Sequence, residues 1–366
     1  MKIGILSMQM IDNYGSLLQA YGLKHVIESL ENSVEFIDIE KIEKDYYLSR
    51  NENKVYADET DGKSKLKKLL DRGVIARLYN KKINKLFKKE CKEFRRDQLD
   101  IYKKSKHYDL CVIGSDEVFN CLNSGWWGYT SQLFGNVPEA DRIITYAASC
   151  GATKYENLPN AIKESIEKYI HNIVGFSVRD NNTYEFAKSF GIQGIENNLD
   201  PVLIYNFDEE VKRAKLPKLP EDYCVIYSYS YRFYKKEEVK AILDFCKVNQ
   251  LTPITIQGGQ TWCRKFIACD PFECLKIFEN AKFVITDTFH GTIFSAKYAD
   301  KFAVITRESN FNKLSDLVKR LGIEKHVIKD ITQLDAVYQI KKDKDTISKI
   351  LEEEAERTKN YLRKYI

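Results

Sequence analysis

A short polar turn in the C-terminal half of the chain carries the clearest chemical signal. Residues 286–291 read Thr-Asp-Thr-Phe-His-Gly, between a predicted strand at 283–285 and a predicted helix at 292–298. Such turns hold ligands in α/β proteins, because free N–H groups and the helix dipole favour an anion there. His290 adds a group that exchanges a proton near neutral pH. We therefore expect a ligand site formed by His290 and its neighbours, Asp287, Thr288, Gly291 and Thr292.

Two turns in the N-terminal half also place polar groups after predicted strands. Residues 13–16, Asn-Tyr-Gly-Ser, follow a strand at 2–7 and open a helix predicted at 16–30. Glycine permits a close approach of backbone to ligand, and Ser16 can cap the helix. Asp116 follows a strand predicted at 110–113, where it can orient a hydroxyl group or act as a base. An ordinary helix cap is the alternative interpretation of both turns.

Three basic side chains are candidates for holding an anionic ligand. Arg179 ends a predicted strand, and a guanidinium group binds a carboxylate or phosphate through two parallel hydrogen bonds. An ion pair with Asp180 or Asp200 is the alternative. Arg307 and Lys313 follow the polar turn and could reach the same cleft, with a surface position as the alternative for each.

Strands and helices alternate along both halves of the chain, which is the pattern of doubly wound α/β domains with parallel sheets. A charged stretch at 207–222 holds two prolines and is predicted to be a linker. We therefore predict two Rossmann-like domains facing a cleft, residues 1–206 and residues 207–366. The second ends in a charged helix at 347–366.

The composition is that of a globular protein. Of the 366 residues, 43% are hydrophobic and 30% are charged, and no apolar run is long enough to cross a bilayer. The apolar run at the N-terminus is too short for the hydrophobic region of a signal peptide. Nine scattered cysteines are typical of free thiols in a reducing compartment. We therefore expect a cytoplasmic protein. The spacing of Cys263, Cys269 and Cys274 differs from that of common zinc sites, so no metal is expected.

Positive charge is concentrated in one segment. Residues 63–106 contain 17 Lys and Arg against 5 Asp and Glu, whereas the whole chain has a net charge of +5. Leucines and aromatic residues recur there at helical intervals, which predicts a basic amphipathic helical insertion. A solvated helix face is one interpretation, and peripheral contact with an anionic membrane or a charged glycan is another. A nucleic-acid partner is not expected, because no nucleic-acid-binding motif accompanies the charge.

Six motifs, in order along the chain, resemble the signatures of the polysaccharide pyruvyl transferase family. Each motif alone is weak, but six in one order are specific. They lie at residues 13–20, 114–120, 146–149, 177–179, 200–201 and 286–292.

The resemblance implies a GT-B-like arrangement and transfer of a pyruvyl group from phosphoenolpyruvate (PEP) to a sugar of a surface polysaccharide, forming a ketal. The acceptor would be an oligosaccharide or a lipid-linked glycan, and no cofactor would be needed. It implies that His290 is the general acid and Asp116 a base for the acceptor hydroxyl. The donor side would lie in the C-terminal domain, together with Arg179, Arg307 and Lys313. The acceptor side would lie in the N-terminal domain and comprise Asn13, Tyr14, Gly15, Gln19 and Ser115.

One residue departs from the family pattern. Characterised members carry an arginine at the position of Thr288, where it helps to hold PEP. Either another cation, such as Arg179, Arg307 or Lys313, supplies this charge, or the donor differs. Two alternatives therefore stay open: a glycosyltransferase that uses a nucleotide-sugar on the same architecture, and a non-catalytic glycan- or membrane-binding protein with this fold.

Overall fold

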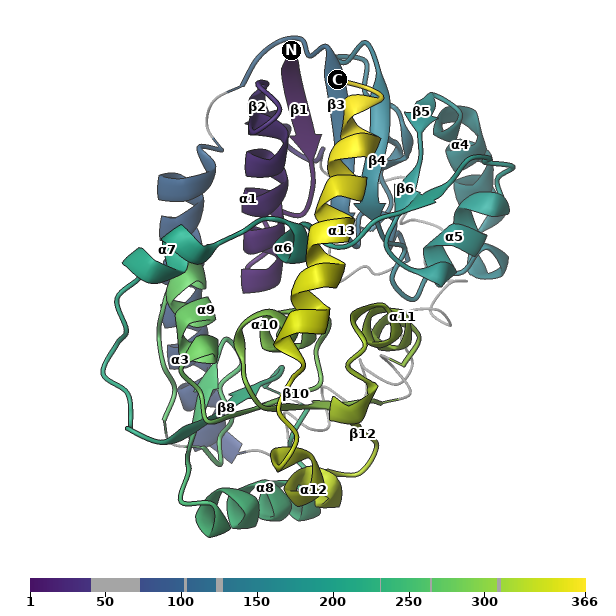
Figure 1. The fold of residues 1–366 in the computed structure, drawn as a ribbon. Coiled ribbons are helices and arrows are strands. Elements are labelled where there is room, and N and C mark those ends of the chain that lie inside the picture. The colour runs from purple at the N-terminus through teal and green to yellow at the C-terminus, as the bar shows by residue number, and fades with distance from the viewer. Residues whose placement is uncertain (41–72, 102–103, 123–127, 231, 264, 308–310) are drawn as a thin grey trace.

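The computed structural model of the chain consists of two α/β domains, one above the other in Figure 1. It describes residues 1–40, 73–101, 104–122, 128–230, 232–263, 265–307 and 311–366. The loop predicted at 46–63 and the first part of the basic segment lie outside these residues. The expected fold is confirmed, because two parallel sheets with helices face a pocket between them, an arrangement of the GT-B type.

The first domain is built on a parallel sheet in the order β2-β1-β3-β4-β6-β7, with β5 paired to β4. In this sheet Ile3 lies opposite Val34 on one side and Leu110 on the other. Every residue of β3 and β4 is buried, as expected for parallel strands covered on both faces. The strands are β1 (Lys2–Leu6), β2 (Ser33–Phe36), β3 (Leu110–Asp116), β4 (Ile143–Ala148), β5 (Ile173–Gly175), β6 (Ser177–Val178) and β7 (Glu196–Asn197).

The second domain has a parallel sheet in the order β12-β11-β10-β8-β9. Chain order reverses direction between β8 and β10, as it does between β1 and β3 in the first sheet. Ligands of doubly wound domains bind at the carboxyl ends of strands beside such a switch point. The strands are β8 (Tyr223–Tyr227), β9 (Thr252–Ile256), β10 (Phe283–Thr286), β11 (Phe302–Ile305) and β12 (Val327–Ile328).

Helices connect the strands and cover the sheets (Figure 1). In the part of the chain that precedes β8 they are α1 (Tyr14–Glu28), α3 (Gly73–Phe94), α4 (Asn160–Ile170), α5 (Asn181–Lys188), α6 (Pro201–Ile204) and α7 (Asp208–Arg213). After β8 they are α8 (Lys236–Val248), α9 (Pro271–Glu279), α10 (Phe289–Tyr298), α11 (Phe311–Leu321), α12 (Leu334–Tyr338) and α13 (Lys344–Arg363).

The two domains share an apolar core. The largest cluster of buried apolar side chains includes Tyr14 of α1, Phe278 of α9 and Phe294 of α10. The C-terminal helix α13 adds to this contact by running back along the first domain, where the Tyr361 hydroxyl donates to the carbonyl of Thr145 at 2.7 Å (Figure 1). The domain boundary predicted at 206–207 stays a prediction. The predicted second domain includes α13, although this helix packs along the first domain.

The start of the helix that follows the polar turn at 286–291 differs from the prediction. The helix predicted to begin at Thr292 begins at Phe289, so His290 lies in the first helical turn rather than in a loop. The reason is a cap: the Thr288 side chain accepts a hydrogen bond from the N–H of Gly291 at 3.0 Å. This cap satisfies a helix donor and allows the helix to start three residues earlier.

Candidate functional site

A pocket opens between the domains, at the carboxyl ends of strands from both sheets. It lies where the switch point of the first sheet faces that of the second, which explains why side chains so distant in sequence meet there. Its lining residues are Asn13, Ser16, Asp116, Glu117, Arg179, Tyr227, Tyr229, Gln257, Thr288, Phe289 and His290.

The first-domain wall is held together by polar contacts between β3 and α1. Asn13 caps α1 by accepting from the N–H of Gly15 at 2.8 Å. The Ser16 hydroxyl donates to the Asp116 carboxylate at 2.5 Å. Asp116 has a φ of 73°, a left-handed backbone that non-glycine residues adopt at a cost of about 1–3 kcal/mol and that concentrates at functional sites. The predicted turns at residues 13–16 and at Asp116 are therefore brought together.

The second-domain wall is the N-terminus of α10. A Cβ on Gly291 would lie 2.1 Å from Oγ1 of Thr286, so a larger residue does not fit under the turn. The N–H groups of Phe289 and His290 precede the first intrahelical donors of α10, and no described residue accepts from them. Unpaired N–H groups at the positive end of a helix dipole are suited to an anion.

Between the walls, one buried carboxylate lies beside a guanidinium group and an imidazole ring. Asp200 Oδ2 is 3.0 Å from Nη1 of Arg179 and 3.6 Å from Nε2 of His290. The second distance is longer than that of an ordinary hydrogen bond. Burial alone would raise the pKa of Asp200, but His290 and Arg179 outweigh it and lower this pKa below its ordinary value. Asp200 therefore stays ionised and faces the ring that sequence motifs mark as catalytic.

Arg179 also extends toward Asp116 and the first residue of α10. Its Nη2 is 3.6 Å from Asp116 Oδ1, and its guanidinium lies 4.3 Å from the ring centroid of Phe289. Arg179 forms the ion pair with Asp200 that was the alternative interpretation. It also lines the pocket, and its binding of an anionic ligand stays a prediction. It sits beside the residue that follows Thr288.

Gln257 is a pocket residue that the sequence did not indicate. Its side-chain oxygen accepts from the Tyr227 hydroxyl at 2.6 Å and from the N–H of Tyr14 at 3.3 Å. With the oxygen held by two donors, the amide nitrogen is the end left for a ligand, and no described residue accepts a hydrogen bond from it. Gln257 follows β9 with a φ of 62°, and its place after a strand was the one available signal.

Several predicted residues lie near the pocket without lining it. The Asp287 carboxylate accepts from Ser228 at 2.5 Å and from Arg307 Nε at 2.9 Å, and Arg307 Nη1 is 3.0 Å from Glu238. Gln19 donates to Ser7 at 2.8 Å beneath α1. The side chain of Lys313 lies outside the described part of the structure. The others support the turns: Tyr14, Gly15, Ser115, Gly291 and Thr292.

The sequence model of the polysaccharide pyruvyl transferase family matches residues 13–309. The chain belongs to this family. Every residue that lines the pocket falls within the matched range, so the pocket is formed by the part of the chain that defines a polysaccharide pyruvyl transferase-family protein. No protein of curated function has a significantly similar sequence.

Solved structures resemble this family member only distantly. UDP-GlcNAc 2-epimerase from Neisseria meningitidis, bound to UDP-GlcNAc, is 9% identical, with 100% of both chains covered and a TM-score of 0.49. The UDP-GlcNAc 2-epimerase from Methanocaldococcus jannaschii is 11% identical over 96% of this chain and 93% of its own, with a TM-score of 0.46. The glycosyltransferase SnogD from Streptomyces nogalater is 11% identical over 99% and 94%, with a TM-score of 0.40. Sequence identities and TM-scores this low say nothing about the substrate of this chain.

The described residues form no cluster of three or more His, Cys, Asp or Glu side chains placed to hold a metal ion. Within those residues, no helix combines the length and the hydropathy needed to cross a bilayer.

Proposed function

We propose that this member of the family transfers a pyruvyl group from PEP to a sugar of a surface polysaccharide, closing a ketal across two hydroxyls. One observation carries the proposal: His290, Arg179 and Asp116 converge in a single pocket at the N-termini of α1 and α10. PEP brings a carboxylate, a phosphate and an enol carbon that must be protonated, and these three side chains together with the free N–H groups match those needs.

Arg179 is the cation that we assign in place of the arginine that characterised members carry at the position of Thr288. Its guanidinium lies on the ring of Phe289, directly after Thr288, and so reaches the same part of the pocket. Arg307 is held between Asp287 and Glu238 instead. Because Asp200 and Asp116 already offset part of the charge of Arg179, the N–H groups of Phe289 and His290 share the binding of the donor.

The reaction proceeds by protonation followed by two additions of oxygen to C2. Protonated His290 delivers its proton to the methylene carbon of PEP, while the Asp200 carboxylate balances the imidazolium charge. The first sugar hydroxyl then bonds to C2 and loses its proton to Asp116. The second hydroxyl displaces phosphate from C2, and its proton leaves with the phosphate. The products are the ketal and inorganic phosphate, and the proton on Asp116 returns through solvent to His290, which restores both side chains.

The test combines donor, acceptor and one substitution. Purified protein is incubated with PEP and a panel of lipid-linked or oligosaccharide acceptors, and phosphate release and a mass increase of the acceptor are measured. His290→Gln should lower the rate about 100- to 10,000-fold while the protein unfolds at nearly the same temperature. The exposed His171→Gln is the matched control.

The alternative reaction, glycosyl transfer from a nucleotide-sugar, is tested by a separate measurement. Thr288 caps α10 and brings no cation, which is the observation that favours a nucleotide-sugar donor. Thermal stabilisation by a nucleoside diphosphate, with neither stabilisation nor turnover by PEP, would replace pyruvyl transfer with glycosyl transfer.

A further inference from the structure

The outer face of α3 carries a row of exposed lysines, Lys81, Lys82, Lys85, Lys88, Lys89 and Lys92. At about 100° per residue they fall within an arc of about 120°, and at about 1.5 Å per residue they occupy about 17 Å of the helix. Leu78 lies in the same arc before the first lysine and is 62% exposed. The lysine row is therefore a narrow, strongly positive strip with an apolar side chain at one end.

Little negative charge offsets the lysine row. Lys89 Nζ is 3.7 Å from a carboxylate oxygen of Glu93. No carboxylate of the described residues lies within ion-pairing distance of the other five lysines. The positive charge of these lysines stabilises no ion pair within the described residues. It is therefore available to a negatively charged partner.

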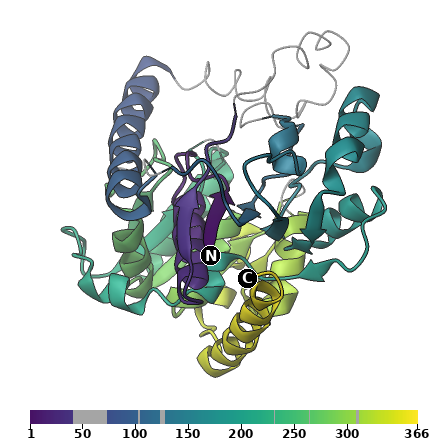
Figure 2. The same cartoon turned by 90° about the horizontal axis from the view of Figure 1, so that it is seen from above.

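The inner face of α3 fixes the helix beside the pocket. Phe87 packs on Tyr14 with ring centroids 4.9 Å apart, and Ile83 lies against Gly259, where an added Cβ would be 3.0 Å from its Cγ2. The Tyr79 hydroxyl donates to the carbonyl of Cys263 at 3.2 Å. Figure 2 shows α3, in blue, at the edge of the molecule, so these inner contacts leave the lysine row facing outward.

We propose that the lysine row docks this protein on an anionic phospholipid membrane. A lipid surface offers negative charge in a plane along the whole strip, and Leu78 can enter the headgroup boundary. Described aromatic side chains of α3 are at least half-buried, so the strip has no platform for stacking nucleic-acid bases. Because Tyr14 packs on α3 and follows Asn13 of the pocket lining, docking would hold the pocket near the membrane. The proposal is independent of the identity of the donor.

The test measures binding of the full chain to vesicles by flotation. One set contains phosphatidylcholine alone, and the other contains equal parts of phosphatidylcholine and phosphatidylglycerol. We expect binding to the second set only, and weaker binding as salt is raised. Because each lysine near an anionic surface strengthens binding about fivefold, K81Q/K85Q/K88Q should weaken it about 100-fold.

The matched control removes the same charge elsewhere. K235Q/K236Q/K247Q changes three exposed lysines at and near α8, at the far end of the second domain, and should leave vesicle binding within about twofold. Equal unfolding temperatures of both variants show that each is folded. The proposal is overturned if the α3 variant binds like the wild type, if both variants weaken binding equally, or if vesicles fail to bind while duplex RNA does.

Discussion

The imidazole of His290 lies directly on the backbone of Gly15. A Cβ placed on Gly15 would be 2.0 Å from Cγ and 2.1 Å from Nδ1 of the ring. Gly15 is in the first turn of α1 and His290 in the first turn of α10, so the two helix N-termini meet at this contact. The glycine of the first motif is thus required by the histidine of the last one.

Gly15→Ala should displace the ring of His290 and lower the rate of phosphate release. A shift of about 1 Å in a catalytic group lowers the rate on the order of 100-fold, and overpacking lowers the free energy of unfolding by about 1–3 kcal/mol. Steady-state kinetics and urea denaturation measure the two effects. Gly194→Ala is the control for destabilisation without a clash: its added methyl meets nothing within 4 Å, but its φ of 65° disfavours alanine, so it should lower stability and leave the rate unchanged. A fully active Gly15→Ala protein would separate His290 from the chemistry.

The two arginines of the predicted donor side should respond differently to the same change. Arg179→Lys keeps a charge but loses the fork that spans Asp200 and Asp116, so affinity for PEP should fall about 10- to 100-fold. Arg307→Lys loosens the link between Asp287 and Glu238, and should lower stability by about 1–3 kcal/mol with PEP affinity unchanged. Calorimetric titration with PEP and denaturant unfolding distinguish the two. The reverse pattern would make Arg307 the donor-binding cation.

The sequence predicted the pocket best where a charged group follows a strand. Asp116 ends a strand of a parallel sheet, and Arg179 and His290 each come after one. Parallel strands end at one edge, so the order of elements predicts that the three meet. Gln257 was missed because an uncharged side chain after a strand has no signature of its own. What orients it in the pocket is the pair of donors from Tyr14 and Tyr227, which come from distant parts of the chain.

Ion pairs between residues far apart in the sequence were the second feature that the sequence could not predict. Arg307 was predicted either to reach the cleft or to lie at the surface. The structure pairs it with Asp287, 20 residues earlier, and with Glu238, 69 residues earlier. The start of α10 was mispredicted for a local reason. Thr288 can be either a turn residue or a helix cap, and only the packing of α10 decides between the two.

Gln257→Glu should impair donor binding with little effect on the fold. The substituted side chain keeps an oxygen for Tyr227 and Tyr14, but it replaces the amide donor by a negative charge facing an anion site. Loss of one hydrogen bond to a charged group weakens binding by about 1.5–3 kcal/mol, or about 10- to 100-fold. The shift in unfolding temperature induced by PEP measures this loss. Gln132→Glu, in a part of the first domain outside the pocket lining, is the control, and equal PEP responses of the two variants would exclude a donor role for Gln257.

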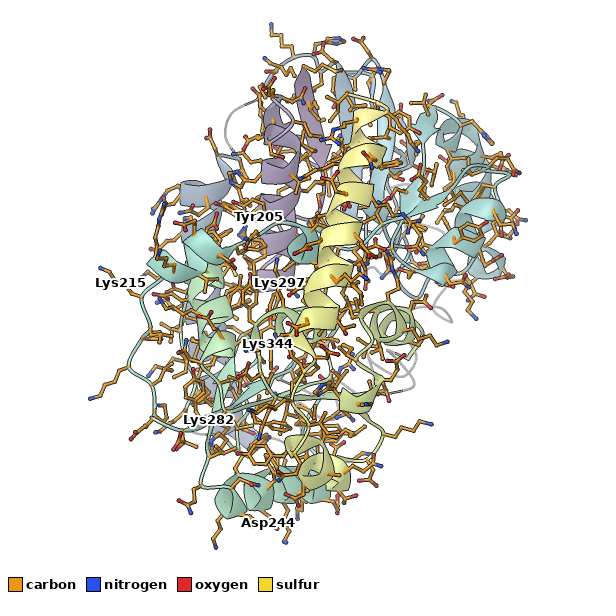
Figure 3. The ribbon with its side chains drawn as sticks, in the orientation of Figure 1. Tyr205, Lys215, Asp244, Lys282, Lys297 and Lys344 are labelled. Carbon is orange, nitrogen blue, oxygen red and sulfur yellow. The ribbon has the colours of Figure 1, made fainter. Side chains whose placement is uncertain are left out.

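Lys297 ties the helix that carries His290 to the first domain. Its Nζ donates to the carbonyl of Val202 at 2.9 Å and also to that of Tyr205, and both carbonyls lie at or just after α6 (Figure 3). Burial lowers the pKa of Lys297 from 10.5 to about 7, against the opposing effect of Asp208 and Glu210.

The pH dependence of stability should therefore carry the signature of this lysine. Between pH 7 and 10.5 the unfolded side chain is protonated and the folded one largely is not, so unfolding takes up a proton and stability rises with pH. Lys297→Met removes this pH-dependent contribution to the free energy of unfolding. The wild type should gain about 2 kcal/mol relative to the variant between pH 7 and pH 9, as measured by urea denaturation at each pH. Lys282→Met, at an exposed site, is the control and should run parallel to the wild type (Figure 3). A constant difference between wild type and Lys297→Met would mean that Lys297 stays charged in the folded protein.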